Sequence, residues 1–123
     1  MDSIRDDAHA TDESSPRLIV DYKSHMGKKD PATVVEASLQ LKIYGFAHER
    51  LFGQLPSAVV LESIEEPKYG WKTITESDAK IAYGAVRNTA QGIRSGNFTP
   101  SSTTVACKYC AHRNTCEYSA YNL

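Results

Sequence analysis

The feature that most constrains the fold is a short apolar run that ends in an acidic residue, a tyrosine and a lysine. Residues 18–24 read Leu-Ile-Val-Asp-Tyr-Lys-Ser, and branched apolar residues of this kind are typical of a strand. Because side chains on a strand alternate between its two faces, Asp21 and Lys23 are expected to project together. Tyr22 is then expected on the opposite face.

This pair has a chemical use and also an ordinary alternative. A carboxylate holds hard metal ions through oxygen, and a lysine beside it can contact a phosphate or the attacking water. Such a pair is what metal-assisted phosphodiester cleavage requires. The alternative is a salt bridge or a solvated strand edge, because Asp-x-Lys is a common pattern and a short motif has a high false-positive rate.

The rest of the chain predicts a mixed sheet with helices packed against it, an α/β (α+β) class. Asp30-Pro31 reads as a helix N-cap followed by proline, and Gly53 and Gly96 follow expected helix ends. The expected elements are strands over 2–6 and 17–24, a loop over 9–16, a helix over 31–52, strands over 57–64 and 71–74, a helix from Thr75 or Ser77 to Ser95, and a loop over 98–105.

Each expected helix has an apolar stripe at steps of mostly three or four residues. In the first helix the stripe consists of Val35, Leu39, Ile43, Phe46 and Leu51. In the second it consists of Ile81, Ala85, Val86, Ala90 and Ile93.

Three further residues are candidates for the same site as the Asp-x-Lys pair. If residues 2–6 and 17–23 are paired strands, Asp2 lies near Asp21 at the open end of a hairpin. Gln40 and Tyr44 are four residues apart and so share one helix face. The alternative for Asp2 is a charged residue at a frayed terminus. The alternatives for Gln40 and Tyr44 are a surface glutamine and a tyrosine half-buried against the sheet.

Three cysteines, Cys107, Cys110 and Cys116, lie within ten residues near the C-terminus. Their odd number and close spacing argue against a disulfide framework and for a metal or iron–sulfur site in a reducing compartment. Thiolates hold zinc or iron–sulfur clusters. Three ligands are one short of four, so either His112 completes a zinc site or a fourth cysteine lies elsewhere.

The composition of the chain excludes few classes of protein. The chain has 123 residues and a net charge of −1, so charge alone predicts no nucleic-acid binding. Residues 77–123 carry five bases and two acids, which suits a phosphate backbone as well as an ordinary solvated surface. The absence of a long apolar run and of a secretory signal predicts a cytoplasmic protein.

Taken together and in order, these motifs resemble the PD-(D/E)XK nuclease superfamily, in its RecB/AddB-like branch. The resemblance rests on Met1-Asp2-Ser3-Ile4, Val20-Asp21-Tyr22-Lys23-Ser24, Gln40-Leu41-Lys42-Ile43-Tyr44 and Cys107-x-x-Cys110-x5-Cys116. It implies a restriction-endonuclease-like core over residues 1–106 and a cysteine-rich tail over 107–123.

The resemblance also implies roles. Asp2 and Asp21 would bind Mg²⁺ or Mn²⁺, Lys23 would be the catalytic lysine, and Gln40 and Tyr44 would support it. The three cysteines would hold a [4Fe–4S] cluster. DNA ends or single strands would be the substrate and a helicase the partner. The family's upstream helix with its histidine, and its fourth cysteine, have no counterpart here, so we expect a fragment with exposed core surface.

Two rival functions come from other classes. The first is a non-catalytic DNA-binding or interaction module that keeps the fold without hydrolysis. The second is a small zinc-binding protein that uses Cys107, Cys110, Cys116 and His112. Metal content separates iron with sulfide from zinc alone.

Overall fold

A computed structural model describes residues 16–121 of the chain. These residues form two compact units that divide between Arg87 and Asn88. Asp2, the strand predicted over 2–6 and most of the loop over 9–16 lie outside the described residues. The functional division at residue 106 stays a prediction.

The first unit contains a three-stranded mixed sheet, in the order β1-β2-β3. Its strands are β1 (Leu18–Lys23), β2 (Ala58–Ser63) and β3 (Tyr69–Lys72). β1 runs parallel to β2 and β3 runs antiparallel to it, so the predicted mixed α+β class is confirmed. β3 begins at Tyr69 rather than Trp71, because Gly70 pairs with Leu61 instead of belonging to the turn.

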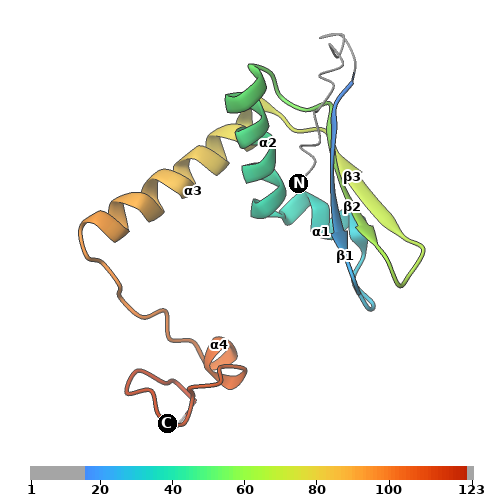
Figure 1. Cartoon of the computed structure of the whole chain (residues 1–123). Helices are drawn as coiled ribbons and strands as arrows, with labels where there is room; N and C mark the ends of the chain where they lie inside the picture. The colour runs from blue at the N-terminus through green and yellow to red at the C-terminus, as the bar shows by residue number, and fades with distance from the viewer. Residues whose placement is uncertain (1–15, 122–123) are drawn as a thin grey trace, which may run out of the picture. The chain divides into compact units, whose positions relative to one another are not determined.

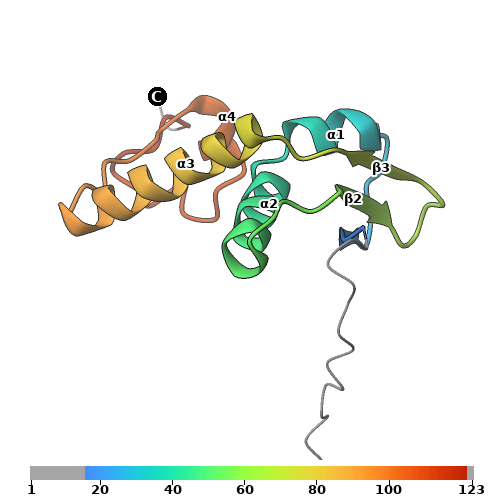
Figure 2. The ribbon, with the colours of Figure 1, turned by 90° about the horizontal axis from the view of Figure 1, so that it is seen from above.

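One face of the sheet is covered by α1 (Pro31–Ala37) and α2 (Leu39–Phe52), as Figures 1 and 2 show. The prediction of a single helix over 31–52 was wrong, because Ser38 breaks it. Ser38 has extended dihedrals (φ −67°, ψ 109°), and its Oγ accepts a hydrogen bond from the Leu41 N–H at 3.2 Å. A serine that caps a new helix competes with continuation of the old one. The predicted caps at Asp30 and Gly53 are confirmed.

The core lies between these helices and the sheet. Fully buried Leu41 and Leu61 each contribute about 1.5–3 kcal/mol on transfer from water. The stripe predicted for this helical segment was right in part: Val35 is buried and Ile43 and Phe46 are partly buried, but Leu39 and Leu51 are exposed. The buried positions of α2 are Leu41, Gly45 and His48. The buried core cluster consists of Met26, Val35, Leu41, Val59, Leu61 and Ile74.

The helix α3 (Glu76–Arg94) matches its prediction closely in length. It begins with a reciprocal cap, in which the Asp78 carboxylate accepts from the Thr75 N–H at 3.0 Å and the Asp78 N–H donates to Thr75 Oγ1 at 3.2 Å. The predicted stripe was wrong, because α3 buries Asp78, Ala79 and Ala82 while Ile81, Val86 and Ile93 stay exposed. Small side chains, rather than large ones, face the core.

The opposite face of the sheet is open among the described residues. Tyr22, Tyr69 and Trp71 are 61%, 68% and 60% exposed. The strand register aligns Tyr22 with Glu62 and Glu62 with Tyr69, and Val60 with Trp71, so these aromatic residues share that face.

The second unit runs from Asn88 and includes the end of α3, where Gly96 adopts φ +70°. The Asn97 N–H then donates to the Gly92 carbonyl at 2.8 Å. A short helix, α4 (Thr104–Lys108), begins inside the loop predicted over 98–105, because Thr103 Oγ1 caps it through the Ala106 N–H at 3.0 Å. No helix among residues 16–121 is both long and apolar enough to span a membrane.

Candidate active site

The face of β1 that looks toward the helices carries Asp21 and Lys23. Burial alternates along the strand, with Asp21 and Lys23 partly buried and Tyr22 exposed on the other side. This alternation is what the pleat requires. In the parallel register Asp21 lies beside Leu61 and Lys23 beside Ser63, so β2 holds both residues on the covered side of the sheet.

Four of the residues singled out in the sequence form one chain of polar contacts. Lys23 Nζ lies 2.8 Å from Asp21 Oδ2 and donates a hydrogen bond to Gln40 Oε1 at 3.1 Å. Gln40 Nε2 then donates to the Tyr44 hydroxyl oxygen at 2.8 Å. Gln40 and Tyr44 lie on one face of α2, as their spacing predicts. The structure therefore brings Asp21, Lys23, Gln40 and Tyr44 together, and Asp2 lies outside the described residues.

Asp21 Oδ2 has an unusual environment. It is buried and accepts no hydrogen bond from the described part of the chain. Lys23 Nζ is close enough to form an ion pair but lies outside the directions of a hydrogen bond. A buried carboxylate oxygen without a donor is costly. Such an oxygen fits a hard divalent cation, which takes oxygen ligands, so the donor chemistry at Asp21 suits Mg²⁺ or Mn²⁺.

A second cluster of ionisable groups was missed in the sequence. His25 follows β1, and Glu65 and Glu66 lie between β2 and β3. Among residues 16–121, these three form the one group of three or more metal-ligand side chains whose ligand atoms all lie within 4.8 Å of one another. No spacing rule could have found it, because the two segments are about 40 residues apart in sequence and only strand pairing brings them together.

Glu66 is held ionised by its neighbours. A hydrogen bond from the Ser63 hydroxyl, together with those from the backbone N–H groups of Met26 and Gly27, lowers the pKa of Glu66 from its ordinary 4.5 to about 2. Hydrogen bonds to the charged form of a carboxyl group favour that form. Glu66 therefore attaches the segment after β1 to the turn between β2 and β3.

Glu66 should contribute to acid stability. Since its pKa is lower in the folded chain than when unfolded, its contribution is complete above pH 4.5 and is lost as the pH falls from 4.5 to about 2. We expect Glu66→Gln to flatten the dependence of the free energy of unfolding on pH in this window, measured by denaturant titration. Glu62→Gln, an exposed carboxylate on β2, is the control. A pH profile of Glu66→Gln that matches the wild-type profile would contradict this assignment.

The three cysteines line a single cavity in the second unit. Its volume is about 210 Å³, and Cys107, Cys110 and Cys116 all contribute to its wall. The Ala120 N–H donates a hydrogen bond to Cys107 Sγ at 3.4 Å. Tight turns shape the segment, because the Cys116 N–H donates to the His112 carbonyl at 2.9 Å. His112 is exposed and is absent from the lining of this cavity.

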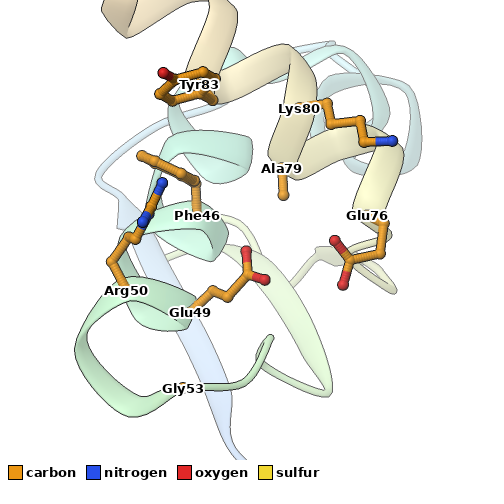
Figure 3. Close-up of a pocket in the computed structure, with 8 residues that line it drawn as sticks. All are labelled: Phe46, Glu49, Arg50, Gly53, Glu76, Ala79, Lys80 and Tyr83. Atoms are coloured by element: carbon orange, nitrogen blue, oxygen red, sulfur yellow. The ribbon is translucent and has the colours of Figure 1, made fainter.

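A larger pocket of about 540 Å³ lies between α2 and the first half of α3 (Figure 3). The Phe46 and Tyr83 rings pack at 5.8 Å, and the Arg50 guanidinium lies 5.3 Å from the Phe46 ring. The wall also holds Glu49, Glu76 and Lys80. None of the residues predicted for the active site lines this pocket.

A family model described as the PD-(D/E)XK nuclease superfamily matches residues 6–117. The matched segment contains Asp21, Lys23, Gln40, Tyr44 and all three cysteines, and it begins after Asp2. No curated protein and no solved structure shows significant similarity to the chain.

Proposed function

Since the chain belongs to the PD-(D/E)XK nuclease superfamily, whose members are mostly metal-dependent nucleases, we propose that its Asp21 site hydrolyses phosphodiester bonds in DNA. The observation that carries the proposal is the buried, undonated Oδ2 of Asp21 beside an ammonium group. The Lys23 ammonium is the one cationic group placed 2.8 Å from this oxygen, and Oδ2 accepts no further hydrogen bond from the described residues. This leaves coordination capacity on Oδ2 for a metal ion.

Each residue of the chain of contacts has a role in this proposal. Asp21 holds Mg²⁺ or Mn²⁺, with Asp2 as the second carboxylate. When bound, the ion supplies Lewis-acid polarisation of the phosphoryl oxygen. Lys23 orients the attacking water and stabilises the negative charge that develops on the phosphate. Gln40, supported by Tyr44, fixes the position of the Lys23 ammonium through its 3.1 Å hydrogen bond.

The order of the motifs and the cysteine tail favour a narrower assignment. We propose a cytoplasmic RecB/AddB-like exonuclease that acts on DNA ends or single strands and works with a helicase domain or subunit. The basic excess over residues 77–123 supports contact with a phosphate backbone.

Cleavage of defined DNA tests the proposal. Linear and circular single-stranded DNA of the same sequence are incubated with the full chain and Mn²⁺ or Mg²⁺. We expect loss of the linear strand, none of the circle, and no reaction in EDTA. Cleavage of the circle would make the enzyme an endonuclease. Binding that weakens steeply with salt but no cleavage with either ion would overturn hydrolysis and favour a binding module.

We further propose that Cys107, Cys110 and Cys116 hold a [4Fe–4S] cluster. The support is that all three cysteines line one cavity and that Cys107 Sγ accepts a backbone hydrogen bond. Hydrogen bonds to cluster sulfurs are a usual feature of such sites. The fourth ligand comes from outside the three cysteines of this chain.

Anaerobic reconstitution with iron and sulfide checks the cluster. We expect a brown protein with equal iron and sulfide, and we expect Cys110→Ser to lose most of both because a thiolate ligand is removed. Ser102→Ala changes another residue in the wall of the same cavity and should retain the cluster. Zinc as the sole bound metal would support the zinc-module alternative instead.

A further inference from the structure

The cluster of His25, Glu65 and Glu66 joins two segments that follow neighbouring strands. His25 Nδ1 lies 2.6 Å from Glu66 Oε1 and 3.1 Å from Glu65 Oε2. One nitrogen and two carboxylate oxygens therefore lie within 4.8 Å of one another. Asp21 does not belong to this group, so the point is distinct from the candidate active site.

Backbone pairing beyond the strand ends holds the two segments in place. The Ile64 N–H donates to the Lys23 carbonyl at 2.8 Å, and the Glu65 N–H donates to the Ser24 carbonyl at 3.1 Å. These bonds extend the parallel pairing of β1 and β2 past the ends of both strands. The pairing of the sheet therefore places the two segments that carry the three ligand side chains next to each other.

The three side chains differ in how firmly they are held. Glu66 is anchored by Ser63 and by the N–H groups of Met26 and Gly27, each 3.2 Å away. The side chains of His25 and Glu65 are 63% and 64% exposed. One fixed carboxylate and two accessible groups make a partly preformed site that a cation can reach from solvent without any movement of the core.

The donor set indicates the class of cation. An imidazole nitrogen together with carboxylate oxygens suits zinc and its neighbours, whereas Mg²⁺ and Ca²⁺ prefer oxygen ligands alone. Three protein ligands leave a further position for water in a tetrahedral site. We propose that His25, Glu65 and Glu66 bind a divalent cation of the zinc class, which fastens the segment after β1 to the turn between β2 and β3.

Zinc titration by calorimetry tests this site. The full chain is first treated with iodoacetamide, so that Cys107, Cys110 and Cys116 do not bind metal. We expect His25→Gln and Glu65→Gln each to lose one zinc equivalent per chain. Glu62→Gln, on the adjacent strand, should keep the wild-type stoichiometry. Glu66 is left unchanged because it also anchors the backbone.

Two further measurements separate the possible outcomes. Zinc should raise the melting temperature of the alkylated wild-type chain but not of His25→Gln, and it should shift the NMR signals of the His25 ring. Asp21→Asn should retain this zinc equivalent. Equal zinc binding by wild type and His25→Gln, or loss of the only equivalent in Asp21→Asn, would overturn the proposal. No DNA is present, so failure of the nuclease proposal would leave this result unaffected.

Discussion

Replacing Lys23 by alanine is expected to reduce DNA cleavage by at least about 100–1000-fold, the usual cost of removing one group that stabilises transition-state charge. The ammonium group of Lys23 lies between Asp21 Oδ2 and Gln40 Oε1, and no other lysine of the described chain forms an ion pair with Asp21. The rate is measured on end-labelled single-stranded DNA with Mn²⁺ in excess.

The matched control is Lys42→Ala. Lys42 lies two positions beyond Gln40 on α2, and its ammonium donates to the Glu36 carbonyl rather than to the site. We expect this variant to cleave at the wild-type rate. If Lys23→Ala cleaves as fast as Lys42→Ala, Lys23 has no catalytic role and the 2.8 Å contact with Asp21 is a structural ion pair.

Asp21→Asn should separate activity from stability. The variant keeps the shape of the side chain but removes the charge that would hold the cation, so cleavage should fall as far as it does in Lys23→Ala. Its free energy of unfolding should stay within about 1 kcal/mol of wild type. The reason is that the lost attraction to Lys23, whose side chain is 41% exposed to solvent, is offset because a neutral amide is less costly to bury than a charged carboxylate.

The largest effect on stability is expected from Gly70→Ala. A Cβ atom at position 70 would lie 2.5 Å from the carbonyl carbon and oxygen of Pro31 and 2.9 Å from the Ala32 nitrogen. These are backbone atoms at the start of α1, which packs across β3, and they cannot rotate away. We expect a loss of about 3 kcal/mol or more in the free energy of unfolding, which is a large share of the stability of a small domain.

Gly84→Ala is the control for Gly70→Ala. A Cβ at position 84 meets no atom within 4 Å, and the residue lies inside α3. Alanine there should stabilise the chain by about 0.5–1 kcal/mol, because glycine loses more backbone entropy in a helix. Denaturant unfolding of both variants measures the contrast. Equal stabilities would show that α1 does not approach β3 as closely as the structure indicates.

Local patterns predicted the positions that matter for the candidate site. The alternation along β1 placed Asp21 and Lys23 on one face, and the spacing of Gln40 and Tyr44 placed them on one face of a helix. Both inferences depend only on backbone periodicity. The roles of these residues stay predictions until the variants are measured.

Predictions that depend on contacts between distant segments of the chain were less accurate. The helix break at Ser38 was not predicted, because a serine can either continue a helix or cap the start of a new one. Tertiary packing decides between these two conformations. The stripe on α3 was wrong because Ala79 and Ala82, not the larger Ile81 and Val86, face the core. Apolar periodicity shows that a helix has an apolar face, but it does not identify the segment against which that helix packs.

By itself, the sequence determined that an acid and a lysine project together from one strand, because side chains of a pleated strand alternate with period two. Only the tertiary structure decided that Asp21 Oδ2 is buried without a hydrogen-bond donor and that Gln40 reaches Lys23. It alone also joined His25 to Glu65 and Glu66. These properties depend on the pairing of β1 with β2 and the packing of α2, which are contacts between segments far apart in the chain.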